Sequence, residues 1–391
     1  MWTALVIFVL ANWVGQEYFA PQPTVLFLYL TVIAVCLRYR APGDPAGRRR
    51  DLAIGIALTL MVVAIVPTHQ LTPLMMIVAL TVLALCRFRV KSLLAVAVLA
   101  TVGWDVLFAW PWIAENLEGL VEKLGSPGMN ARSGFINLAD ASQSQVVVAM
   151  IDRAHSGAIV MLAILGFVRC FRHNRRFTLA LLALAPLPVV AINDYDGEMV
   201  FRIYLFTLPF LCIYAAAAFF PTERGGRSWL TRLTLPAVLL LLIPGFLVSY
   251  YGKEQANYFT RGEANASVFV YGIAPRGSLI IGATRDFPWA FMNYEFYSYG
   301  RFGLLESEDR EALLDDPVGG FSDLMAPYHH AYLVLTRSQI ADVEMTGAMP
   351  HGSVAQVREA LLRSPMFTVI YRTDDAVVLT LSHPQLEEAA L

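Results

Sequence analysis

Apolar residues are gathered into long blocks over the first 250 positions, and short polar loops separate these blocks. Blocks with few internal charges are typical of helices that cross a membrane, which need about 20 apolar residues to span a hydrocarbon core of about 30 Å. The pattern predicts nine transmembrane helices, several of them short. They cover approximately residues 2–14, 23–37, 52–66, 72–86, 92–112, 146–169, 177–192, 203–220 and 233–250.

The pattern changes after position 251, where short apolar runs alternate with polar, helix-like segments. The runs SLIIGA at 278–283 and AYLVLT at 331–336 predict buried strands. Two further strands at 367–372 and 376–381 predict a hairpin around Thr373-Asp374-Asp375. Helices are predicted at 257–271, 306–314 and 354–363. The predicted architecture is an α-helical polytopic membrane bundle, residues 1–251, followed by a small α/β domain, residues 252–391.

Basic residues are divided unequally between alternate loops. If nine helices alternate strictly, one set of loops carries 15 basic residues: Arg38, Arg40, Arg48, Arg49, Arg50, Arg87, Arg89, Lys91, Arg169, Arg172, Arg175, Arg176, Arg224, Arg227 and Arg232. The other set carries four: Lys123, Arg132, Arg153 and Arg202. An excess of Lys and Arg marks the cytoplasmic side. The sequence therefore predicts a multi-pass plasma-membrane protein with a cytoplasmic N-terminus and an extracytoplasmic C-terminal domain.

Composition agrees with a membrane class. Hydrophobic residues make up 57% of the chain and charged residues only 15%, whereas about a quarter of a soluble domain is charged. The four cysteines lie in or beside apolar blocks, which favours a packing role over a disulfide framework. The sequence contains no P-loop, GxGxxG, HExxH or paired CxxC motif. The lipid bilayer is the expected partner, nucleic acid is not expected, and the oligomeric state is left open.

One loop on the predicted outer side, residues 193–202, is dense in charged side chains. It carries Asp194, Asp196, Glu198 and Arg202 between two apolar blocks, where charge needs water, a partner or a substrate. Glu198 and Arg202 are four residues apart, so they share a helix face and are able to pair. Such a pair would orient the arginine towards a phosphate, with the free aspartates as base or ligands of a divalent cation. The alternative is a solvated turn whose acids stabilise a helix N-terminus.

Four other polar residues on or near the outer side are candidate site residues. Glu17 is the acid of the first outer loop and is a catalytic candidate or an interfacial anchor. His69, in a proline-bounded turn, is a general base or sugar-binding side chain, or a residue bonded only to backbone. Asp105 lies inside an apolar block, where an acid suggests a binding role or a bond between helices. Arg153 either faces the same outer site as the charged residues of 193–202 or marks the membrane boundary.

Several phrases resemble a group of actinobacterial multi-pass membrane proteins of the GT-C glycosyltransferase type. They are NWVGQEYFAPQPTVLFLYL (12–30), PTHQLTP (67–73), DGEMVFRIYLFTLPF (196–210) and SPMFTVIYRTDDAVVLTL (364–381). The resemblance implies a transferase that uses a polyprenyl-phosphate-linked sugar as donor at the extracytoplasmic face, and a soluble outer domain. Taken with the residue patterns above, the catalytic candidates are Glu17, His69, Asp196 and Glu198, and the substrate-binding candidates are Asp105, Arg153, Asp194 and Arg202.

The sequence departs from that family in its first outer loop. GT-C enzymes usually carry an Asp-Asp, Asp-Glu or Asp-x-Asp pair there, whereas this loop offers only Glu17. Fuller relatives have further spans ahead of the Asn-Trp-x-Gly-Gln segment, so the resemblance is consistent with a shortened version, a fragment or a misplaced start. Two hypotheses follow. One is a GT-C-like transferase, or a truncated relative, acting on lipid-linked sugars in cell-envelope glycan synthesis. The other is a non-catalytic envelope-assembly or transport component whose outer domain binds a glycan or protein partner.

Overall fold

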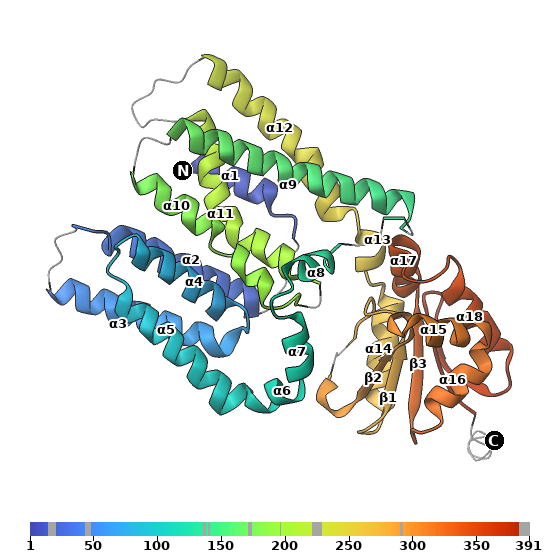
Figure 1. The fold of residues 1–391 in the computed structure, drawn as a ribbon. Coiled ribbons are helices and arrows are strands. Elements are labelled where there is room, and N and C mark those ends of the chain that lie inside the picture. The colour runs from blue at the N-terminus through green and yellow to red at the C-terminus, as the bar shows by residue number, and fades with distance from the viewer. Residues whose placement is uncertain are drawn as a thin grey trace. The chain divides into compact units, whose positions relative to one another are not determined.

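The computed structural model describes residues 1–14, 21–43, 48–135, 138–139, 141–170, 174–195, 197–220, 229–289 and 292–382. The chain is mostly helical, with one small mixed sheet in its C-terminal part (Figure 1). It divides into two compact units. One unit contains Met1–Phe135 and Ile151–Tyr250, and the other contains Ile136–Met150 and Tyr251–Leu391. The second unit therefore takes in the start of a long helix as well as the predicted outer domain.

The described residues of the first unit form helices joined by turns and short loops. The helices are α1 (Trp2–Ala11), α2 (Pro21–Tyr39), α3 (Arg48–Thr68), α4 (Thr72–Leu85), α5 (Lys91–Trp104), η1 (Asp105–Ala109), α6 (Trp110–Glu115), α7 (Leu117–Lys123), α8 (Pro127–Arg132), α9 (Gln143–Cys170), α10 (Asn174–Leu184), η2 (Leu187–Ala191), α11 (Met199–Phe219) and α12 (Trp229–Tyr251). Each of the nine predicted apolar blocks overlaps one or more of these helices, although the first block extends past the end of α1.

Six apolar helices are long enough to cross a membrane among the residues that the structure describes. They are Pro21–Tyr39, Arg49–Thr68, Lys91–Glu115, Gln143–Cys170, Met199–Phe219 and Leu233–Tyr251. Three shorter apolar helices cover Trp2–Ala11, Thr72–Leu85 and Phe177–Ala191. At 1.5 Å per residue, the 14-residue α4 is about 21 Å long, less than a hydrocarbon core of about 30 Å. A membrane-type helical protein is thus confirmed, while the count of nine spans stays a prediction.

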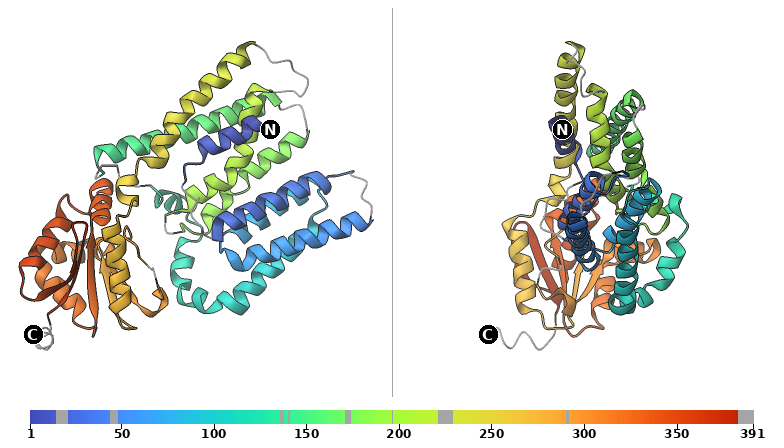
Figure 2. Two further views of the ribbon diagram at one scale, coloured as in Figure 1. Left: turned by 180° about the vertical axis from the view of Figure 1, so that it is seen from behind. Right: turned by 90° about the vertical axis from the view of Figure 1, so that its left-hand side faces the viewer.

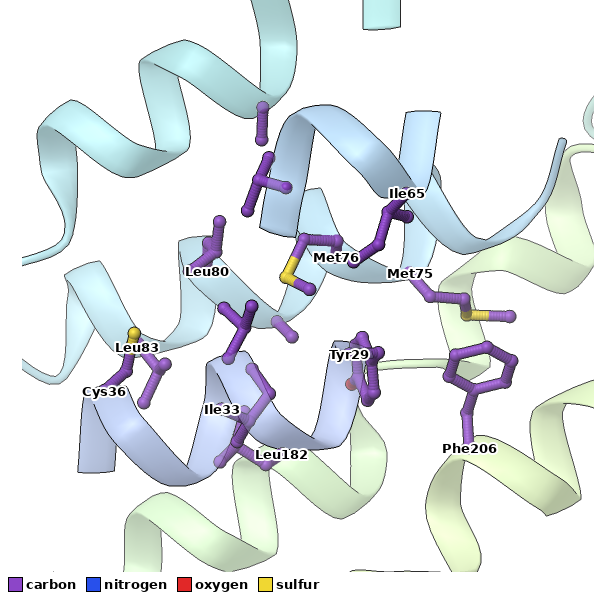
Figure 3. Packing of buried hydrophobic residues seen from close by; sticks show 14 of the residues in the cluster. Tyr29, Ile33, Cys36, Ile65, Met75, Met76, Leu80, Leu83, Leu182 and Phe206 are labelled. Carbon is purple, nitrogen blue, oxygen red and sulfur yellow. The ribbon is translucent and has the colours of Figure 1, made fainter. Parts of the chain in front are cut away.

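Helix α11 is the centre of the first unit. Of the six long helices it has the most buried apolar stretch, with 56% of its residues buried. On one side it packs against α2, α4 and α10, where Tyr29 meets Phe206 edge-on with ring centroids 5.0 Å apart (Figure 3). On the other side it packs against α1, α9 and α12. Gly166 of α9 lies so close to α11 that an added Cβ would be 1.7 Å from the carbonyl oxygen of Tyr214. Side chains on α11 are therefore held firmly by packing on both sides.

Because successive helices run in opposite directions, their ends gather at two ends of the first unit (Figures 1 and 2). At one end, the backbone N–H of Arg89, after α4, donates to the carbonyl of Arg40, after α2, over 2.9 Å. We call this the basic end. At the opposite end, the turn between α3 and α4 lies beside the loop that precedes α11, as contact between His69 and Tyr195 shows. We call this the acidic end, after Asp194 and Glu198 of that loop.

The second unit is a five-stranded sheet with helices on both faces. The strands are β1 (Leu279–Gly282), β2 (Ser298–Arg301), β3 (Ala331–Thr336), β4 (Phe367–Arg372) and β5 (Ala376–Leu381), in the spatial order β2-β1-β3-β5-β4. Strand β1 runs parallel to β2 and β3, β5 is antiparallel to β3, and β4 and β5 form the predicted hairpin. The helices are α13 (Glu254–Asn257), α14 (Arg261–Ile273), α15 (Ser307–Asp315), α16 (Pro317–Met325), α17 (Arg337–Thr346) and α18 (Ser353–Arg363), with short 3₁₀ turns η3 (Tyr294–Phe296) and η4 (Phe302–Leu304).

Alternation along β3 explains why the sheet needs cover on both faces. Leu333 and Leu335 join the apolar cluster under α15, α16 and α18, whereas Tyr332 and Val334 join the cluster under α14. All six residues of β3 are buried, as its unbroken apolar run predicts for a central strand. The predicted strands β1, β3, β4 and β5 are confirmed. Strand β2 and helices α16 and α17 were not predicted.

Candidate functional site

His69 occupies the turn between α3 and α4 at the acidic end. Its Nδ1 accepts a hydrogen bond from the backbone N–H of Thr72 over 3.3 Å, and the Thr72 hydroxyl lies 3.0 Å from the same atom. Since an N–H donates to Nδ1, the neutral ring carries its proton on Nε2. The centroid of the ring lies 6.3 Å from that of Tyr195. His69 therefore presents an N–H donor, rather than a free lone pair, beyond its own turn.

Arg202 lies in the first turn of α11, and only 6% of its surface is exposed. Its guanidinium pairs with the carboxylate of Glu198, one helical turn earlier, and lies over the ring of Tyr195 at 5.8 Å from the centroid. The side chain of Glu198 is 53% exposed, so the pair joins a buried cation to a solvent-facing anion. The predicted Glu198–Arg202 pairing is confirmed. We refer to His69, Tyr195, Glu198 and Arg202 together as the His69–Arg202 cluster.

The charge of Arg202 acts on His69. Burial disfavours the charged imidazolium, and the nearby guanidinium disfavours it further, so the pKa of His69 is lowered to about 4. At neutral pH the imidazole is therefore uncharged. The cluster then contains one buried positive charge, one exposed negative charge and a neutral N–H donor. Such a group is suited to binding an anion with hydroxyl-bearing neighbours.

The loop before α11 reaches this position through an unusual backbone. Tyr195 has a φ of +54° and Gly197 a φ of +82°, and the backbone N–H of Tyr195 is held by the Asn193 side chain over 2.7 Å. The chain also passes close to residues 133–134: a Cβ on Gly197 would lie 2.8 Å from the carbonyl oxygen of Ser133, and one on Gly134 would lie 2.5 Å from that of Gly197. Glycine is required at both positions because the two backbones touch.

Asp194 is engaged in the structure of this loop. Its carboxylate pairs with Lys123 at 2.7 Å, and 16% of its side chain is exposed. Lys123 ends α7, and its carbonyl accepts a 2.9 Å bond from the side chain of Asn130, which also donates to the carbonyl of Val190. These bonds tie α7 and α8 to the segment before α11. Sequence reasoning placed Lys123 on the outer side but missed its pairing with Asp194, because the partners are 71 residues apart.

The other candidates lie elsewhere. Glu17 and Asp196 fall outside the described residues. Asp105 begins η1, the π-helical turn within the α5–α6 helix, and is half-buried. Arg153 is exposed on α9, and its guanidinium lies over the ring of Phe135 at 5.5 Å. The structure thus brings His69, Glu198 and Arg202 together and adds Tyr195, an aromatic residue that the pattern of charges did not point to. Within the described ranges, no three His, Cys, Asp or Glu residues are grouped as a metal site.

In the second unit, polar residues gather after β1. The backbone N–H of Ala283 donates to Gln339 over 2.8 Å, and the hydroxyl of Ser338 donates to the carbonyl of Asp286. Burial and the facing carboxyl of Asp342 raise the pKa of Asp286. These bonds fasten the loop to α17, which favours the interpretation of a packed loop here.

Comparison with known proteins assigns no family: no protein-family model matches the sequence, and no curated protein matches it. The His69–Arg202 cluster is therefore the observation on which a functional proposal rests.

Proposed function

We propose that the protein is a GT-C-like glycosyltransferase of the plasma membrane that uses a polyprenyl-phosphate-linked sugar in cell-envelope glycan synthesis. In this proposal all nine apolar helices span the bilayer, the N-terminus is cytoplasmic, and the acidic end and C-terminal domain are extracytoplasmic. The unequal distribution of basic loop residues supports the orientation. The resemblance of four segments to GT-C proteins supports the reaction class.

The observation that carries the proposal is the buried guanidinium of Arg202 at the mouth of a central membrane helix. A buried arginine near the end of a membrane helix is stable when an anion neutralises its charge. Its present partner, Glu198, is more than half exposed, so a phosphate reaching the mouth is able to replace it on the guanidinium. The Nε2–H of His69 would donate to a phosphate oxygen or sugar hydroxyl. The aromatic face of Tyr195 would pack against the sugar or isoprenoid.

In the proposed reaction, an acceptor hydroxyl attacks the anomeric carbon of the donor. A glycosidic bond forms, and the bond from that carbon to the phosphate oxygen breaks. The electron pair leaves with the polyprenyl phosphate, whose negative charge Arg202 stabilises. Glu198, released from Arg202 by the phosphate, takes the proton of the acceptor hydroxyl. Glu17 and Asp196 are the other acids proposed for catalysis, with a divalent cation as an optional further component.

The remaining candidates take supporting roles in the proposal. Asp194 holds the loop through Lys123, so it positions Tyr195 and Glu198 instead of acting on substrate. Asp105 and Arg153 would contact more distant parts of the donor or acceptor. This assignment separates residues whose loss should stop transfer from residues whose loss should weaken it.

The test is sugar transfer in membranes that contain the full chain, supplied with a panel of polyprenyl-phosphate hexoses and pentoses. R202A and E198A should each abolish transfer. The matched control is Glu359 and Arg363, another Glu–Arg pair four residues apart, whose side chains are 61% and 80% exposed. E359A and R363A should transfer at the wild-type rate. Unchanged transfer in R202A and E198A would sink the assignment of this site.

The second candidate function is a non-catalytic envelope-assembly or transport component. It is favoured by the C-terminal segment 252–391, which has its own apolar core and carries 18 acidic against 10 basic residues. Under this alternative the full chain binds an envelope glycan or a basic protein partner, and no polyprenyl donor supports transfer. A wild-type protein that binds an envelope glycan but transfers no sugar from the whole panel would favour it.

A further inference from the structure

A pocket of about 320 Å³ lies between α3 and α5 at the basic end of the first unit. One end of it is polar and is lined by Arg40, Asp51 and Arg89. The rest is lined mainly by apolar side chains of both helices, Leu52 and Ile56 among them. A ligand with a charged group at one end and an apolar chain at the other would match this pocket.

The polar end is built from side chains that hold one another in place. Arg89 donates to the carboxylate of Asp51 over 2.7 Å and to the carbonyl of Tyr39 over 3.0 Å. Arg40 donates to the backbone carbonyl of Asp51 over 3.0 Å, and Gly55 leaves room for its guanidinium, which an added Cβ would approach to 3.1 Å. Each guanidinium has five N–H donors, so both keep donors beyond these bonds. Two arginines and one aspartate leave a net positive charge, which is complementary to an anion.

The apolar part of the pocket opens towards the outside of the helical unit. Leu52 is 64% exposed, Ile56 53% and Leu60 65%, whereas Leu58 is 2% exposed. Positions 51 to 60 extend about 14 Å along α3, nearly half of a hydrocarbon core of about 30 Å. In a bilayer these exposed side chains meet acyl chains, starting directly below the guanidiniums.

We propose that this pocket binds an anionic phospholipid. The phosphate lies on the guanidiniums of Arg40 and Arg89, and the first part of one acyl chain lies along Leu52, Ile56 and Leu60. Basic pockets between membrane helices recognise lipid phosphates in this way. A purely apolar ligand would leave the remaining N–H donors of the two guanidiniums unused, and a soluble phosphate compound would leave the apolar part unfilled. The guanidinium end of the pocket is separate from the His69–Arg202 cluster, because the helix from Asp51 to Thr68, a rise of about 26 Å, lies between them.

The experiment measures lipid binding to the full chain in detergent by native mass spectrometry. The probes are phosphatidylglycerol, phosphatidylcholine with the same acyl chains, and inorganic phosphate. Wild-type protein should prefer phosphatidylglycerol over phosphatidylcholine by about tenfold. R40Q/R89Q should lose that preference, and R363Q, which removes an exposed arginine of the second unit, should keep it. Equal binding of the two lipids by wild type, or an unchanged preference in R40Q/R89Q, would overturn the proposal.

A second variant tests the acyl part without disturbing the guanidiniums. I56W fills the apolar part of the pocket and leaves the Arg40–Asp51–Arg89 contacts intact. It should weaken phosphatidylglycerol binding by about tenfold while the thermal midpoint of the protein stays unchanged. Wild-type affinity in I56W contradicts an acyl chain in this pocket. Displacement of phosphatidylglycerol by an equal concentration of inorganic phosphate would also contradict it, since the site would then recognise phosphate alone.

Discussion

The two ends of the helical unit use the same chemical pair, an arginine and a carboxylate, in opposite ways. At the basic end, Arg89 and Asp51 have side chains that are 37% and 25% exposed. At the acidic end, Arg202 is buried at 7%, whereas Glu198 is 53% exposed. A partly exposed pair contributes little to stability, whereas a buried cation depends on its partner. The two pairs therefore differ in what the loss of the carboxylate exposes: at the basic end a partly hydrated guanidinium, and at the acidic end a buried one.

The largest difference in stability is expected between glycine substitutions at the two ends. Gly197 and Gly43 both have positive φ, at +82° and +76°, but only Gly197 is pressed against another segment. G197A combines backbone strain with a clash against the carbonyl of Ser133, so it should lower the unfolding free energy by about 3 kcal/mol. G43A meets nothing within 4 Å and should lower it by about 1 kcal/mol. Thermal unfolding in detergent compares them, and equal losses would show that the close approach at Gly197 carries no energy.

Removing the carboxylate partner at the acidic end should have the next largest effect. E198A leaves the guanidinium of Arg202 buried without its carboxylate, so the unfolding free energy should fall by about 2 kcal/mol. D51A at the basic end should lower it by about 0.5 kcal/mol, because Arg89 is open to water. The readout is the unfolding midpoint of each purified variant. A loss in D51A as large as that in E198A would contradict the distinction drawn between the two pairs.

The pH dependence of the acidic end depends on His69. Its pKa is lowered to about 4 in the folded protein from 6.5 in the unfolded chain, so the unfolded state binds the proton more readily. This contribution to stability is present above about pH 6.5 and is lost as the pH falls towards 4. With allowance for screening by solvent at the half-buried ring, acidification from pH 7 to 5 should cost about 1 kcal/mol. H69Q should flatten this part of the profile when the unfolding midpoint is measured against pH, and an unchanged profile in H69Q would contradict the role of His69.

The smallest effect is expected in the second unit, and it has the opposite sign. The pKa of Asp286 is raised by burial and by Asp342, so the folded state holds its proton more tightly than the unfolded chain does. This contribution is present at acid pH and is lost as the pH rises through the raised pKa. D342N should therefore slow hydrogen exchange of the loop after β1 at pH 8 by about threefold, and it should change little at pH 5. Faster exchange in D342N at pH 8 would show that the second carboxylate stabilises the loop.

The pattern of apolar and polar residues predicted most strands of the second unit. It missed the elements whose own residues show no clear periodicity. Strands β1 and β3 are continuous apolar runs, and the hairpin of β4 and β5 flanks an Asp-rich turn. Strand β2, with the sequence SYGR, is a half-exposed edge strand whose pairing with β1 comes from the sheet. Helix α16 contains Gly319 and Gly320, which are poor helix formers, and depends on the cap provided by Asp316. Helix α17 follows β3 directly, with Thr336 as both the last strand residue and the helix cap.

Some contacts of the candidate site also follow from the sequence, whereas others depend on the tertiary structure. The spacing of Glu198 and Arg202 along the chain determines their pairing, because positions four apart share a helix face in any helix. The apolar blocks likewise determine a membrane-type helical unit, because such surface is stable only in lipid or against other helices. The approach of His69 to Tyr195 and Arg202, the pairing of Lys123 with Asp194, and the pocket between α3 and α5 arise from the tertiary structure alone. These contacts join residues far apart in the chain, and the packing of the helices against one another brings them together.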